Sequence, residues 1–308
     1  MKRKPDLQGV VEMTVGAAVM LVIILVILHF RTGQTPAEQL ALKTRASALA
    51  AQMQTGMAAA SEAEKSAVLA PTDEASQTFA DQARAATADV ERERGELAAL
   101  LKSNGDQAAQ AALAQFTEGF AEFQRVDREL LTLAVQNTNL KAYDLAFGPA
   151  AAALHEMDSA LIHVAVVDEK TMRLADTARI AAWRMLTLIP PHIAEESEPK
   201  MNAMETQMAA EDDAVRRSLT ALAAFPLLAG NADLKAAAAS YARFSETRAQ
   251  ILKFSRANTN VRSLSISLNQ KRNVMLVCQA ALISLQQAIQ AEPIAGMTYG
   301  TPVRPRGL

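Results

Sequence analysis

The sequence predicts an all-α protein, with an N-terminal transmembrane helix followed by two tandem up-down four-helix-bundle modules. Glycine (12) and proline (11) are scarce among the 308 residues, so few positions interrupt a helix. Half of the residues are hydrophobic but only 4% are aromatic. This Ala-rich mixture is typical of long helices and argues against a strand-rich fold. The third observation is an internal repeat, described below.

Composition also excludes several classes of function. The formal net charge of −2 gives no reason to expect nucleic acid as a partner. The single cysteine, Cys278, excludes an intramolecular disulfide and a thiolate zinc cluster. The histidines are scattered, and His192 is expected in a turn after Pro190-Pro191. No hydrolase, phosphate-loop or haem-attachment motif occurs, so we expect no enzymatic activity, no catalytic residue, no metal and no cofactor.

Residues 10–30, VVEMTVGAAVMLVIILVILHF, form the first predicted helix. At 1.5 Å per residue this stretch reaches about 30 Å, the thickness of the bilayer's hydrocarbon core. A cleaved signal peptide is the alternative, but the apolar run is long for one and no small-x-small site follows it directly. Lys2, Arg3 and Lys4 precede it, so the positive-inside rule places residues 1–9 in the cytoplasm and the bulk of the chain outside it.

The remainder contains two similar copies. A shift of 121 residues places Phe120-Ala-Glu-Phe123 over Tyr241-Ala-Arg-Phe244, and Asn137-Thr-Asn-Leu-Lys141 over Asn258-Thr-Asn-Val-Arg262. Both matches share one register without a gap, which makes chance an unsatisfactory explanation. We therefore predict two modules, 36–165 and 166–291, and an extended or disordered tail at 292–308.

Turn residues divide each module into four segments with helical periodicity. After each Asn-Thr-Asn a heptad of apolar residues resumes, as in a left-handed bundle, and in the second copy Lys271 occupies a core position of this heptad. Asn139 and Asn260 are expected to be N-caps of a helix–helix turn. No helix-breaking residue lies at the boundary between residues 165 and 166, so the two helices that meet there are either separate or continuous. The predicted helices are 37–69, 73–103, 107–136, 139–165, 166–189, 196–225, 233–257 and 260–291.

The anchor, the helical unit and the repeated segments LLTLAVQNTNLKAYDLAFGPAAAAL and ILKFSRANTNVRSLSISLNQKRNVMLVCQAAL together resemble a known family. They are similar to the four-helix-bundle sensor domains of bacterial methyl-accepting chemotaxis proteins, here in tandem. The resemblance implies a single-pass protein of the bacterial inner membrane whose periplasmic part senses small ligands or partner proteins. No second span or cytoplasmic signalling part is seen after residue 291, so we expect the module to act through a partner.

The best candidate ligand-binding residues are Arg179, Trp183 and Arg184. Arg179 and Trp183 are four residues apart, so they share a helix face and could hold a small anion against an aromatic surface. The alternative is a solvated arginine pair beside a packed tryptophan. For the whole chain, the competing function is a structural accessory or scaffold subunit of a membrane or periplasmic complex. In both cases we expect a homodimer or a subunit of a larger membrane complex, attached to the bilayer through residues 10–30.

The predicted topology has a direct test. A protease added outside the inner membrane should digest residues 32–308 and spare only the N-terminal segment, because the basic residues retain that end in the cytoplasm. The measurement is immunoblotting of tags placed at each end. Protection of a C-terminal tag would reverse the predicted orientation.

Overall fold

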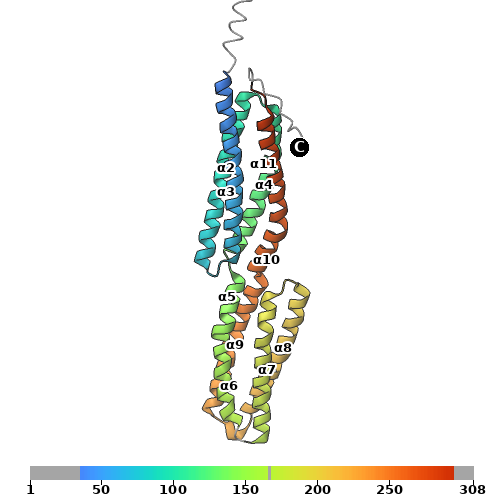
Figure 1. The fold of residues 1–308 in the computed structure, drawn as a ribbon. Helices are drawn as coiled ribbons and strands as arrows, with labels where there is room; N and C mark the ends of the chain where they lie inside the picture. Colours follow the sequence, from blue (N-terminus) through green and yellow to red (C-terminus); the bar gives the residue numbers. More distant parts are fainter. Residues whose placement is uncertain (1–34, 166–167, 295–308) are drawn as a thin grey trace, which may run out of the picture. The chain divides into compact units, whose positions relative to one another are not determined.

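The computed structural model describes residues 35–165 and 168–294, and over these ranges all regular secondary structure is helical (Figure 1). The predicted all-α class is therefore confirmed for this part of the chain. The predicted cytoplasmic segment 1–9, the anchor 10–30 and most of the predicted tail lie outside the described residues. The α-helices are α2 (Pro36–Leu69), α3 (Asp73–Asn104), α4 (Gln107–Ala134), α5 (Thr138–Leu145), α6 (Ala151–Ala165), α7 (Glu169–Ala194), α8 (Glu198–Ala223), α9 (Ala232–Ala257), α10 (Thr259–Ile266) and α11 (Arg272–Ala291).

The described residues also form three short elements: η2, a 3₁₀ turn at Pro226–Leu228, and two π-helical turns, η1 (Ala146–Ala150) and η3 (Ser267–Lys271). The π turns interrupt the helices predicted at 139–165 and 260–291. They are related by the same 121-residue shift as the sequence repeat. Pro149, which has no N–H to donate, lies in η1, but η3 contains no proline. Proline therefore does not account for both π turns.

Both ends of α7 differ from simple sequence expectations. Asp168 is extended and forms a capping box with Thr171, in which the Thr171 N–H donates to Asp168 Oδ1 at 2.7 Å. Helices α6 and α7 are therefore separate, which resolves the alternative left open at residue 165. At the other end, the turn predicted at Pro190-Pro191 is wrong, because α7 continues to Ala194. Burial of His192 and Ile193 on the core face holds this last turn in helical form.

Each Asn-Thr-Asn marks the start of a helix as predicted, at Thr138 and Thr259, but the predicted N-caps, Asn139 and Asn260, are wrong. The residues at the cap positions of α5 and α10 are Asn137 and Asn258, which adopt the left-handed conformation (φ 48° and 51°) that asparagine tolerates better than most residues. Asn139 and Asn260 lie in the first helical turns. There, each backbone N–H donates to the other residue's Oδ1 at 3.1 Å.

Thr138 and Thr259 extend this reciprocal arrangement. The Thr138 N–H donates to Thr259 Oγ1 at 3.2 Å, and the Thr259 N–H donates to Thr138 Oγ1 at 3.0 Å. First-turn N–H groups have no acceptor within their own helix. Each copy therefore caps the other, and the sequence repeat becomes a local two-fold relation between α5 and α10. We call this paired segment, residues 137–139 and 258–260, the Asn-Thr-Asn junction.

The fourth helix of each repeat packs with the other repeat. Helix α6 packs against α7 and α9, and residues of 142–251 share one hydrophobic core. Ile266, in α10, belongs instead to a core with residues of α2, α3 and α4. This differs from the two modules predicted in chain order, 36–165 and 166–291, in which each repeat would pack with its own fourth helix. The two repeats therefore exchange their fourth helices. The exchange arises because a single residue, Asn258, separates α9 from α10, and one residue is too few to reverse the direction of the chain.

The chain divides into two compact units. The described part of unit 1 consists of residues 35–53, 92–115 and 281–294, and that of unit 2 of residues 54–91, 116–165 and 168–280. Among the described residues, one helical stretch, Ala232–Ala291, is long and apolar enough to cross a membrane. A core helix of a soluble protein meets the same criterion, and this stretch contributes buried side chains such as Leu282 and Leu285.

The junction predicts an unusually costly asparagine substitution. Asn139→Ala should lower the free energy of unfolding by about 3 kcal/mol, because it leaves the Asn260 N–H, Asn258 Oδ1 and the Ile193 carbonyl without partners. Chemical denaturation measures this change. The control is Asn273→Ala, at an exposed position of α11, which should change stability by less than about 0.5 kcal/mol. Equal effects of the two substitutions would contradict the reciprocal capping.

Candidate functional site

The structure brings two of the three predicted ligand-binding residues together. Arg179, on α7, donates to Asp158 of α6 from Nε (2.7 Å to Oδ1) and from Nη2 (3.3 Å to Oδ2). The same guanidinium donates to Asp176 at 2.9 Å. The Trp183 indole N–H also donates to Asp158, at 3.3 Å. The arginine and the tryptophan thus converge on one carboxylate, as an anion clamp would.

Arg184 lines the same surface depression as Arg179 and Trp183, but its guanidinium is not directed to Asp158. Its guanidinium lies 3.6 Å from a carboxylate oxygen of Glu211, on α8. Arg179 and Trp183 already have an anionic partner within the chain, the Asp158 carboxylate. Hydrogen bonds from Arg179 hold the pKa of this carboxyl below its usual value. An open surface depression borders these side chains. An external anion would therefore have to replace Asp158, and ligand binding by Arg179, Trp183 and Arg184 stays a prediction.

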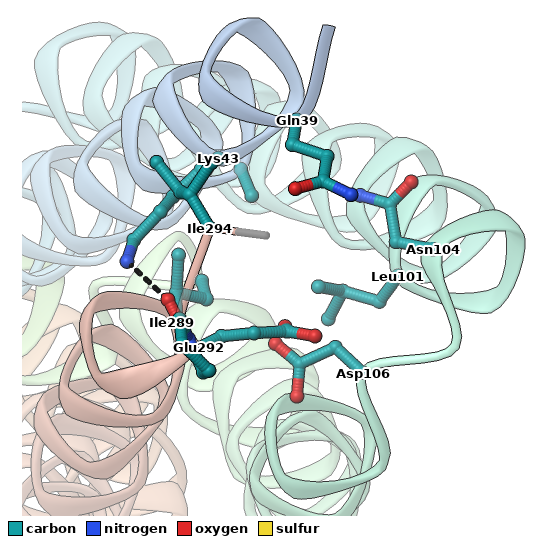
Figure 2. Close-up of a pocket in the computed structure, with 10 residues that line it drawn as sticks. Gln39, Lys43, Leu101, Asn104, Asp106, Ile289, Glu292 and Ile294 are labelled. Carbon is teal, nitrogen blue, oxygen red and sulfur yellow. Dashed lines mark hydrogen bonds between the residues drawn. The ribbon is translucent and has the colours of Figure 1, made fainter. Parts of the chain in front are cut away.

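A more enclosed cavity of about 90 Å³ lies in unit 1 (Figure 2). Its polar wall contains Asp106, in the α3–α4 turn, and Glu292, just after α11. The Asp106 carboxylate also caps α4 by accepting the Ala109 N–H at 2.8 Å. Lys43, from α2, donates to the backbone carbonyls of Gln290 and Glu292 at 2.6 and 2.7 Å. The cavity is well below the 300 Å³ or more of typical small-molecule sites.

Unit 2 contains a buried cluster of ionisable groups, Glu64, Asp127 and Lys271. The Lys271 ammonium donates to the Asp127 carboxylate and lies 3.3 Å from the centroid of the Phe123 ring. Both carboxylate oxygens of Glu64 are buried, and the neighbouring Ser267 and Lys271 only partly offset the cost of burying the charged form. Burial therefore raises the pKa of Glu64, and burial lowers the pKa of Lys271. The sequence indicated only Lys271, as a charged residue at a core heptad position.

The positions related to this cluster by the 121-residue shift carry different chemistry. The 121-residue shift replaces Glu64, Asp127 and Lys271 by Met185, Arg248 and Ala150. Arg248 contacts the Met185 sulfur and also pairs with Asp212 at 3.3 Å. The interior formed by α2, α4 and η3 thus holds two carboxylates and a lysine, whereas the matching positions in α7, α9 and η1 hold an arginine and two apolar residues.

A second polar network surrounds His192 near the end of α7. Its Nδ1 lies 2.7 Å from Ser255 Oγ and its Nε2 lies 2.9 Å from Glu205 Oε1, while Arg256 donates to the same carboxylate at 2.7 Å. These distances resemble those of a serine hydrolase triad. However, the side chains of His192 and Ser255 are fully buried, so a substrate could not reach the hydroxyl. The network holds α7, α8 and α9 together.

Other chemistry finds little support in the described part of the chain. No group of three or more His, Cys, Asp or Glu side chains there is arranged to hold a metal ion. Cys278 is buried, and burial raises the pKa of its thiol to about 11, so little reactive thiolate forms at neutral pH. Comparisons with protein-family models, curated proteins and solved structures gave no match to this chain. Any functional inference therefore depends on its own residues and geometry.

The His192 network predicts a stability that falls on acidification. Burial lowers the pKa of His192 below 6.5, so below pH 6.5 the unfolded state binds more protons than the folded state does. Wild-type stability should decrease as the pH falls from 6.5 towards the folded-state pKa, and His192→Gln should remove that component. Denaturation curves between pH 5 and 8 measure it. The matched control, exposed His163→Gln, should retain the wild-type dependence; an unchanged slope in His192→Gln would refute the assignment.

Proposed function

We propose that this chain is a membrane-anchored helical sensor or receptor-like module of the bacterial periplasm that acts through a partner protein. In this proposal residues 10–30 span the inner membrane once and residues 1–9 lie in the cytoplasm. The apolar length of the span and its basic flank support this topology. The repeat and the core formed by residues of 142–251 support two four-helix bundles, each completed by a helix from the other repeat.

The observation that carries the sensor proposal is the exchange of helices at the Asn-Thr-Asn junction. Asn139 Nδ2 donates to the Ile193 carbonyl, at the end of α7, and to Asn258 Oδ1, both at 2.7 Å. Asn137 Nδ2 donates to Asp73, the first residue of α3, at 3.0 Å. A displacement of α5–α6 therefore alters hydrogen bonds to helices of both repeats. A sensor requires such a connection between its binding region and the rest of the chain.

The Arg179 clamp supplies a site at which a ligand would act on this connection. Asp158 belongs to α6 and Arg179 to α7, so a small anion that replaced the Asp158 carboxylate would release α6 from α7. The bound anion would keep the charge-assisted hydrogen bonds of the guanidinium, which favours carboxylates over neutral ligands. Trp183 would cover one side of the site, and Arg184 would add positive potential.

The alternative function is a structural accessory or scaffold subunit. Phe147 and Leu268 occupy equivalent positions of the π turns η1 and η3, and their exposed fractions are 68% and 58%. Large apolar side chains exposed at matching positions favour contact with another protein. Either a homodimer or a larger membrane complex would cover them.

The sensor proposal is tested by the thermal unfolding of the detergent-solubilised chain with acetate, succinate and phosphate. A ligand that binds the native state at one hundred times its Kd stabilises it by about 2.7 kcal/mol, so the melting temperature should rise. Arg179→Gln should abolish the rise, whereas Arg173→Gln, on an exposed part of the same helix, should retain it.

A ligand-independent melting temperature would favour the scaffold alternative. The particle mass in mild detergent then becomes the deciding measurement. A dimer or a larger complex that Phe147→Ser with Leu268→Ser dissociates would support the scaffold. A single 33.0 kDa copy without partners would contradict it.

A further inference from the structure

Three separate parts of the chain meet at the unit 1 cavity. Lys43 comes from α2, Asp106 from the turn between α3 and α4, and Glu292 from the end of α11. Figure 2 shows the Glu292 side chain extending towards the Asp106 carboxyl across the cavity. The contact therefore connects the C-terminal end of α11 to the other helices of unit 1.

The two carboxyls face each other without a cation between them. Lys43, the charged group of α2 at the cavity, directs its ammonium to the carbonyl oxygens of Gln290 and Glu292. The end of α3 contributes Asn104 and Leu101, which carry no charge. Among the described residues, no Lys or Arg side chain forms an ion pair with Asp106 or Glu292. Two ionised carboxylates would repel one another here.

A shared proton removes this repulsion. When Glu292 is protonated, its O–H can donate to the Asp106 carboxylate, which remains an acceptor and keeps its bond to the Ala109 N–H. We propose that the Glu292–Asp106 pair is an acid-strengthened latch that fastens the end of α11 to the α3–α4 turn. Loss of the proton loosens the segment from Gln290 to Ile294, which includes the buried Ile294.

Proton linkage gives the direction and the pH window of the latch. The hydrogen bond to Asp106, with burial and the Asp106 charge, raises the pKa of Glu292 from 4.5 to about 7, and Lys43 opposes the shift. A loosened Glu292 returns to its ordinary pKa. The equilibrium for opening therefore increases by up to about tenfold per pH unit between pH 4.5 and 7, and is constant above pH 7. The window lies near neutral pH, and the latch does not depend on the proposed sensor function.

Hydrogen exchange of the full-length protein tests the latch locally. Protection factors of the backbone amides in 286–294, corrected for intrinsic exchange rates, should fall by up to about fortyfold from pH 5 to pH 7 in the wild type. Glu292→Gln donates a hydrogen bond at every pH, so its protection factors should not depend on pH. The control, Glu96→Gln, changes an exposed carboxylate of unit 1 that pairs with Arg45, and it should behave as the wild type.

A second variant keeps the test decisive if Glu292→Gln fails to fold. Asn is a good N-cap, so Asp106→Asn retains the cap of α4 while it removes the facing charge. The pKa of Glu292, followed by the NMR shift of its carboxyl carbon, should then fall from about 7 towards 4.5. An unchanged pKa in Asp106→Asn, or wild-type protection factors that do not vary with pH, would overturn the latch.

Discussion

The reciprocal capping of α5 and α10 is the constraint on which the other features of unit 2 depend. The first N–H groups of a helix need acceptors, and in this interior the acceptors are side chains of the opposite repeat. Each donor and acceptor is related to its counterpart by 121 residues, so a slip of one residue would leave buried polar groups unpaired. The junction thus fixes the relative register of the repeats. It also anchors neighbouring helix ends, through the Ile193 carbonyl and Asp73.

The sequence predicted the helices well because the signals for helices are local. Apolar periodicity and turn residues placed the ends of most helices within a few residues of their structural positions. Prediction from the sequence failed where side chains from distant parts of the chain determine the local structure. Local rules predict that a proline pair such as Pro190-Pro191 ends a helix, yet α7 continues past both residues because His192 and Ile193 are buried in the core. The N-caps were misplaced by two residues because the partners of Asn139 and Asn260 belong to another helix.

The candidate sites likewise contain some features that the sequence predicted and others that depend on distant parts of the chain. Helical spacing correctly placed Arg179 and Trp183 on one face, but it could not show that Asp158, on a different helix, fills the clamp between them. Lys271 was detectable as a charge at a core position, whereas Asp127 and Glu64 become its neighbours only through the exchange of the fourth helix. Asp106 and Glu292 gave no signal, because nearly two hundred residues separate them in the chain.

A comparison of the two repeats separates what the fold requires from what can vary. The left-handed asparagines, the crossed threonines and the π turns occur at equivalent positions in both copies, although η1 and η3 share no residue. The buried charges do not follow this symmetry, since Glu64 and Asp127 correspond to Met185 and Arg248. The backbone geometry of the two copies therefore has to match at the junction, whereas the polar groups of the interior depend only on the side chains around them. Consequently, the buried ionisable groups can differ between equivalent positions of the repeats, while the junction and the packing of each fourth helix against the other repeat keep the two copies connected.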